Sequence, residues 1–103
     1  MSSRSEIRFN FRQALSQADD LDDLADRLVK LYGTTMENSM QLLAQAWKGE
    51  NATAFLNKET ILKGDIRKTA SEIRDIASDI RSIARRVYNA EMEAWRIANE
   101  RDS

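Results

Sequence analysis

The stretch Trp47-Lys48-Gly49-Glu50-Asn51-Ala52-Thr53-Ala54-Phe55 lies near the middle of a chain of 103 residues, between two long segments of helical pattern. A glycine two positions after a tryptophan can end a helix, because glycine adopts the left-handed backbone conformation without steric cost. The indole can then pack at the corner. Asn51 is a predicted N-cap for the following helix, since its side chain can accept from free backbone amides. The stretch therefore predicts the turn of a helical hairpin.

The composition agrees with helices on both sides of this turn. The chain has no proline and three glycines, whereas sheet proteins and loop-rich folds need more turn residues. We predict an all-α fold with a single domain over residues 1–103, built as a two-helix antiparallel hairpin. Its first helix would span about 11–47, the turn about 48–51 and the second helix about 52–98, with short flexible ends.

The first half of the chain carries two neighbouring apolar stripes. Ile7, Phe9 and Phe11 alternate with polar residues, so the first dozen positions are expected to be extended. Helical spacing of three and four then takes over and continues to Trp47. Gly33 is expected to kink the first helix, and Gly64 the second, because glycine costs roughly 1 kcal/mol relative to alanine inside a helix.

The second half of the chain becomes a strict heptad pattern. The residues that recur every seven positions are Ile66, Ile73, Ile80, Val87 and Ala94. Three residues after each of the first four come Thr69, Ile76, Ile83 and Ala90. Ala70, Ala77 and Ala84 flank this seam and form a strip of small residues that a neighbouring helix can approach closely. The residues predicted for the hairpin or dimer core are Ile66, Ile73, Ile76, Ile80, Ile83 and Val87.

A hairpin of this shape cannot cover its own apolar stripes. The second helix would be about 70 Å long at 1.5 Å per residue, and a lone partner helix covers only one side of it. Two hairpins that pair into a four-helix bundle solve this problem. The stripes therefore predict a dimer.

Several classes of function are disfavoured by composition. The net charge is −1, from 16 basic and 17 acidic residues interspersed along the chain, so no one-sided positive field is expected for nucleic acid. Without histidine or cysteine, the usual general base, nucleophile and metal ligands are missing. We expect no enzymatic activity, no metal and no cofactor. The acidic run 19–26 lacks the ligand spacing of a calcium loop and is interpreted as a solvated helix face.

The N-terminal residues lack the apolar core of a secretory signal peptide. No segment approaches the roughly 20 apolar residues that span a bilayer, so no stable membrane insertion is expected. The expectation is a protein made in the cytoplasm that, if exported, is secreted without a signal peptide.

The central tripeptide, the following Ala52 and Phe55 and the length near a hundred residues resemble the WXG family. These are small helical-hairpin proteins similar to the early-secreted antigens of bacterial type VII secretion. The resemblance implies pairing as homodimers or heterodimers and export in the folded state by an ATPase-driven machine. It also implies that Trp47, Gly49 and Phe55 form a turn and export motif, and that a secretion ATPase is a partner.

The family's export signal has a second half, an aromatic residue followed four positions later by Asp or Glu. Here Tyr88 is followed by Met92 at that spacing, and the acidic residues Glu91 and Glu93 lie one step to either side. Trp95 is followed four positions later by Asn99. The candidate C-terminal recognition residues are Tyr88, Glu91, Met92, Glu93 and Trp95. Of these, Tyr88, Met92 and Trp95 share one helical face by their spacing, and they either form a recognition patch for a partner or cap the bundle core.

The resemblance implies a small type VII secretion substrate or export partner that acts through protein–protein contacts. The alternative is a cytoplasmic adaptor or targeting chaperone that heterodimerises with the helical N-terminus of a larger secreted toxin. Met92, in the position of the family's acidic residue, favours this alternative. A third reading is an unrelated coiled-coil scaffold with a chance Trp-x-Gly.

Overall fold

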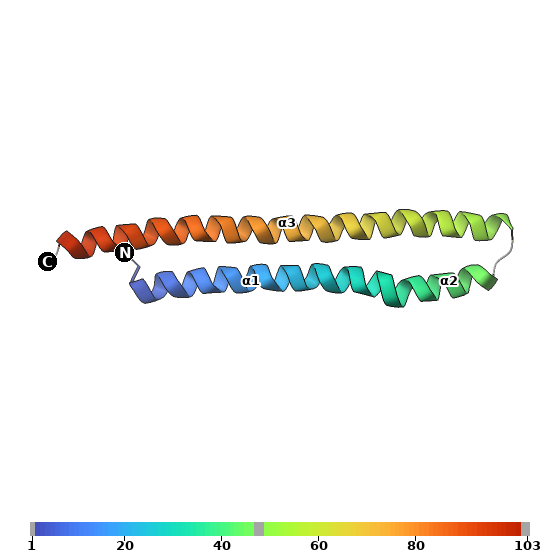
Figure 1. Ribbon diagram of the computed structural model, residues 1–103, viewed down its shortest axis with the longest axis horizontal. Coiled ribbons are helices and arrows are strands. Elements are labelled where there is room, and N and C mark those ends of the chain that lie inside the picture. The colour runs from blue at the N-terminus through green and yellow to red at the C-terminus, as the bar shows by residue number, and fades with distance from the viewer. Residues whose placement is uncertain (1, 47–48, 102–103) are drawn as a thin grey trace. The chain divides into compact units, whose positions relative to one another are not determined.

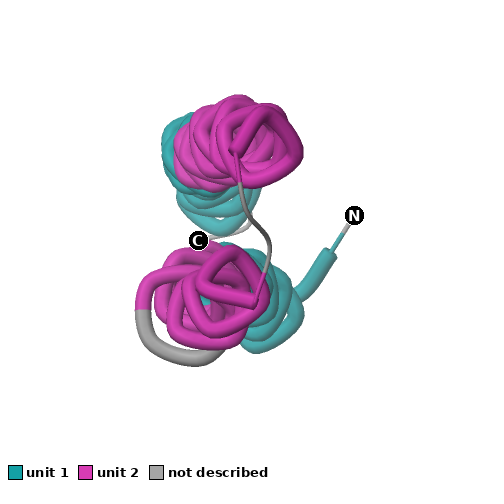
Figure 2. The backbone as a smooth tube through the Cα atoms, turned by 90° about the vertical axis from the view of Figure 1, so that its right-hand side faces the viewer, with its two compact units in different colours: residues 1–21, 75–103 teal, residues 22–74 magenta. Residues whose placement is uncertain are grey.

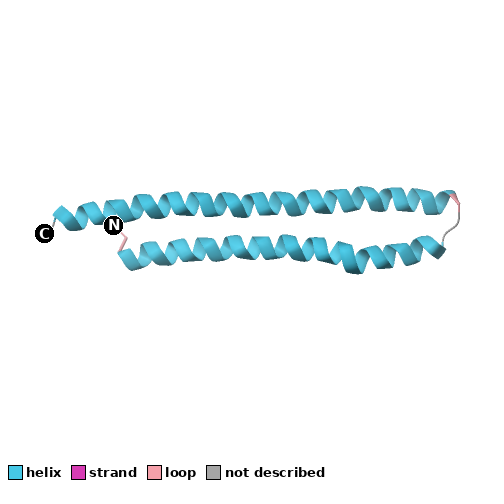
Figure 3. Ribbon diagram, viewed as in Figure 1, coloured by secondary structure: helices cyan, strands magenta, loops and turns pink. Residues whose placement is uncertain are grey.

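The computed structural model describes residues 2–46 and 49–101. Along them run α1 (Arg4–Lys30), the π-helix η1 (Leu31–Met36), α2 (Glu37–Ala46) and α3 (Glu50–Arg101), as labelled in Figure 1. No strand occurs in this described part of the chain (Figure 3). The predicted all-α class is confirmed.

The chain divides into two compact units, residues 1–21 with 75–103 (unit 1) and residues 22–74 (unit 2), coloured separately in Figure 2. In unit 1 the first part of α1 pairs with the last part of α3, with Asp19 bonded to Arg81 at 2.7 Å. In unit 2 the rest of α1, η1 and α2 lead through the turn into α3, and Glu37 meets Lys63 at 3.2 Å. Each unit is a pair of antiparallel helical segments, in agreement with the predicted hairpin.

The first helix starts earlier than predicted. The backbone N–H of Glu6 donates to Ser3 Oγ at 3.2 Å, which supplies one of the free amides at the start of α1 with an acceptor. Ile7 is 3% exposed, and Phe11 follows it at a helical spacing of four. The expected extended segment and the helix start near residue 11 are therefore wrong. Ile7 and Phe11 pack on one helix face, and this burial outweighs the local alternation.

The turn contains the predicted left-handed glycine. Gly49 has a φ of 66°, and α3 begins at the next residue, Glu50. The backbone N–H of Thr53 donates to the Gly49 carbonyl at 3.3 Å. Asn51 already lies inside the first turn of α3, so its predicted role as N-cap is wrong. Gly49 itself precedes the helix, because its backbone conformation lets the chain enter α3 directly.

Substitution of the glycines should separate backbone strain from helix propensity. Gly49→Val should lower the free energy of unfolding by about 1–2 kcal/mol, because a left-handed backbone is costly for a β-branched residue. Gly64→Ala, inside α3 with no atom near the added methyl group, should instead raise it by up to about 1 kcal/mol. Thermal unfolding followed by circular dichroism measures both. Equal effects of the two substitutions would contradict the strained role of Gly49.

In each unit, the two helical segments pack against each other along a seam of buried alanines. Ala18 and Ala77 in unit 1 are fully buried, as are Ala25 and Ala70 in unit 2. The predicted strip of small residues on the second helix is thus confirmed at Ala70 and Ala77. Helices joined by alanine can approach closely, but an alanine buries little apolar area. No large side chain is fully buried among the described residues.

Half of the predicted core lies outside this seam. Ile66, Ile73 and Ile80 are half-buried beside the alanines. In contrast, three large apolar residues of α3 are 48–53% exposed, namely Ile76, Ile83 and Val87. They lie outside the hairpin seam, because the alanine strip rather than the neighbouring isoleucine stripe faces α1. A role in a dimer core stays a prediction.

The two internal glycines behave differently. The helix changes to a π-helix at Leu31–Met36, where the Glu37 N–H donates to the Tyr32 carbonyl, five residues earlier. Gly33 lies in this segment and weakens the local α-helix, in line with the interruption expected there. Gly64 interrupts nothing, since α3 is assigned as one α-helix from Glu50 to Arg101.

The acidic run contributes ion pairs as well as solvated charge. Asp19 pairs with Arg81 in unit 1, and Asp26 pairs with Arg74 in unit 2, each at 2.7 Å. All four side chains are at least one-third exposed, so each pair adds only about 0.2–1 kcal/mol. The run therefore helps to fix the register of the antiparallel segments. None of the described helices is apolar over a stretch long enough to span a bilayer.

Candidate functional site

The predicted C-terminal recognition residues lie on α3 in unit 1, beside the first turns of α1. Tyr88 packs on Phe11 with ring centroids 4.6 Å apart and the planes tilted by 44°. The Arg85 guanidinium lies over the other aromatic ring of this pair, 5.7 Å from the centroid of Phe11. Tyr88 is half-buried, and its ring is anchored within the chain.

An apolar groove of about 290 Å³ runs beside this aromatic pair. The α1 side contributes Ile7, Asn10, Phe11 and Ala14. The α3 side contributes Ile80, Ile83, Ala84, Val87, Tyr88 and Glu91. Glu91, a predicted recognition residue, is half-buried at one end of it. Ile83 and Val87 line the groove and are also exposed on α3. The groove is therefore continuous with the exposed apolar stripe of Ile76, Ile83 and Val87.

The remaining recognition residues line a second, open hollow nearer the end of α3. Its walls are Arg4, Asn89, Met92, Glu93, Trp95 and Arg96, around a volume of about 520 Å³. The Arg4 guanidinium lies 5.5 Å from the Trp95 ring centroid, within cation–π range. The structure therefore separates the five predicted residues: Tyr88 and Glu91 line the groove, while Met92, Glu93 and Trp95 line the hollow.

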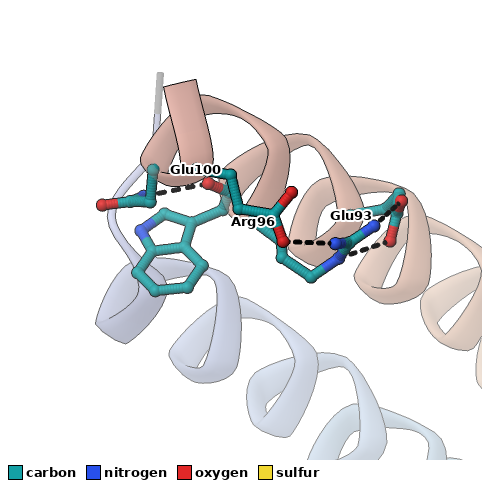
Figure 4. Close-up of polar contacts among 5 residues, drawn as sticks. Glu93, Arg96 and Glu100 are labelled. Carbon is teal, nitrogen blue, oxygen red and sulfur yellow. Dashed lines mark hydrogen bonds and ion pairs between the residues drawn. The ribbon is translucent and has the colours of Figure 1, made fainter. Parts of the chain in front are cut away.

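Two of the charged residues at the hollow, Glu93 and Arg96, are already ion-paired. Arg96 bonds to the Glu93 carboxylate and to Glu100, the latter at 2.7 Å (Figure 4). The hydrogen bond from Arg96, and then its charge, lowers the pKa of Glu93. The same hydrogen bond to Glu93 raises the pKa of Arg96. Glu93 is thus held as an anion by its own helix.

Sequence reasoning missed a polar cluster in unit 2. Tyr32 is 3% exposed, and its hydroxyl donates to the Glu59 carboxylate at 3.0 Å. Lys63 bonds to Glu37 and lies 5.8 Å from the Tyr32 ring centroid. Burial, then the Glu59 hydrogen bond, raises the pKa of the Tyr32 phenol. The signal was present in the sequence, since Glu59 and Lys63 extend the series Ile66, Ala70 and Ile73 with polar residues at seam spacing.

The structure describes only part of the predicted turn motif Trp47, Gly49 and Phe55. Gly49 has the expected conformation, and Phe55 is half-buried in the second turn of α3. Trp47 and Lys48 lie outside the described residues. The predicted roles of Trp47 and Phe55 in export stay predictions.

Comparisons with known proteins identified no relative of this chain. No protein-family model matches the chain, and none of the curated proteins or solved structures that were searched gives a significant match. The resemblance to the WXG family accordingly rests on the sequence features named above.

The groove has mainly aromatic and aliphatic walls, which suit the burial of partner side chains. The hollow is more polar, because Arg4, Asn89, Glu93 and Arg96 surround Met92 and Trp95. Within residues 2–46 and 49–101, no group of three or more acidic side chains is placed to hold a metal ion.

Proposed function

We propose that this chain is a small substrate or export partner of a bacterial type VII secretion system, which acts through protein–protein contacts rather than catalysis. The observation that carries the proposal is the left-handed Gly49, directly before α3, in a Trp-x-Gly sequence between antiparallel helical segments. This is the position at which the WXG pattern requires its turn.

Dimerisation into a four-helix bundle is part of this proposal. The closed seam of each unit is built from alanines, and large side chains such as Leu24, Ile76 and Ile83 remain 46–53% exposed. Burial of one such side chain contributes about 1.5–3 kcal/mol. A second hairpin, from the same or another chain, would supply this burial.

In the proposed mechanism, the bundle presents a composite surface to the membrane ATPase. The surface combines the turn of one protomer with the C-terminal segment of the other. Met92 occupies the place of the expected acidic residue, and Glu93 is held by Arg96. These observations favour a second candidate, an adaptor that heterodimerises with the helical N-terminus of a secreted toxin and uses the toxin's signal.

An export assay in the native host tests the proposal. Wild type should accumulate in the culture supernatant only when the secretion ATPase gene is intact, and Trp47→Ala should remain in the cells. Ser78→Ala, an exposed change on α3, is the matched control and should be exported normally. Export that persists without the ATPase would contradict the proposal. Export that requires a co-expressed toxin would favour the adaptor role.

A further inference from the structure

The exposed apolar stripe of α3 in unit 1 carries an unusual charge arrangement. Ile76, Ile83 and Val87 are about half exposed, and Ile80 lies half-buried at their edge. Along one flank of this stripe lie Asp79 and Arg86, seven residues apart and so on the same helix face. Both side chains are exposed.

Asp79 and Arg86 carry charges that are free to pair with another chain, unlike the other arginines nearby on α3. Arg81 is bonded to Asp19, Arg85 lies over Phe11, and Arg96 is held by two glutamates. Across the described residues, neither Asp79 nor Arg86 forms a hydrogen bond or ion pair. The stripe therefore has an acidic residue, Asp79, near its Ile76 end and a basic residue, Arg86, near its Val87 end.

The stripe and its two charges match a second copy of α3 that runs in the opposite direction. If a second α3 lies antiparallel on the stripe, Ile76 meets Val87 of the second copy and Ile80 meets Ile83 of the second copy. The same register places Asp79 beside Arg86 of the second copy, and the two-fold axis repeats the pair. A parallel arrangement would instead place Asp79 beside Ala84 of the second copy, where it gains no ion pair.

We propose that two copies of this chain associate symmetrically through the α3 stripe, with antiparallel α3 helices and reciprocal Asp79–Arg86 ion pairs. The proposal rests on the dimeric bundle of the proposed function and names its partner and register. The groove beside Ile83 and Val87 offers room for large side chains of the second copy. One heptad outward, Glu93 would meet another glutamate, and Arg96, already bonded to Glu93, offsets that repulsion.

Charge reversal tests this register directly. Asp79→Arg and Arg86→Asp should each weaken the homodimer about tenfold or more, because two attractive pairs become repulsive. An equimolar mixture of the two variants should restore dimerisation, since each ion pair then joins opposite charges again. The doubly reversed variant, which carries both changes, should also dimerise. Light scattering coupled to size-exclusion chromatography and sedimentation velocity report the masses.

Controls separate assembly from folding. Ser78→Arg adds a charge at an exposed position on the face of α3 opposite the stripe, and should leave the dimer intact. Helix content by circular dichroism identifies any variant that fails to fold. Two outcomes would overturn the proposal: a wild type that stays monomeric, or folded variants whose mixture does not restore the dimer. Neither outcome decides the proposed function, because export with a different partner is measured separately in the native host.

Discussion

Ala77→Asp should destabilise the chain by about 3 kcal/mol. Ala77 is fully buried in the seam between α1 and α3. A carboxylate at this position loses its hydration, and its short side chain cannot reach past the closely packed helix to water. The midpoint of thermal unfolding should fall by more than about 10 °C.

Ser78→Asp provides the matched control for this change. It introduces the same side chain into the same helix one residue later, where the position is exposed, so the cost of aspartate in a helix is common to both. The control should change stability by no more than about 0.7 kcal/mol, the penalty of helix propensity alone. Similar losses in the two variants would refute the closed alanine seam.

Tyr32→Ala should have a comparable effect in unit 2, with a loss of about 3–5 kcal/mol. The phenol ring is 3% exposed, and its removal leaves a cavity beside Glu59 and Lys63. Phe9→Ala, the deletion of an aromatic ring that is 60% exposed, is the control and should cost within about 0.5 kcal/mol. Chemical denaturation of the two variants measures the difference.

The Tyr32 hydroxyl also predicts a dependence on pH. Burial and the hydrogen bond to Glu59 raise its pKa above the ordinary value of 10.0, so the folded state holds this proton more strongly than the unfolded state. The contribution to stability is complete below pH 10.0 and is lost as the pH rises through the raised pKa. Tyr32→Phe should unfold with less alkaline sensitivity than wild type. An unchanged alkaline slope would show that Tyr32 does not titrate as proposed.

The sequence predicted which residues form the candidate recognition surface, but not how they are arranged in space. Helical spacing placed Tyr88, Met92 and Trp95 on one face, and all three are half-buried. Their separation into a groove and a hollow depends on Phe11 and Arg4, which come from the other end of the sequence. Spacing along one helix carries no information about which distant side chain packs against it.

The sequence by itself determined the helical class and the turn at Gly49, because both follow from local chemistry. The absence of proline, the apolar periodicity and the freedom of glycine at positive φ act within a few residues. Only the tertiary structure decided which of two neighbouring stripes on α3 faces α1. Both stripes are apolar, so periodicity could not choose between them. Ala70 and Ala77 lie in the buried seam, where small side chains let two helices pack closely, and Ile76, Ile83 and Val87 are left outward.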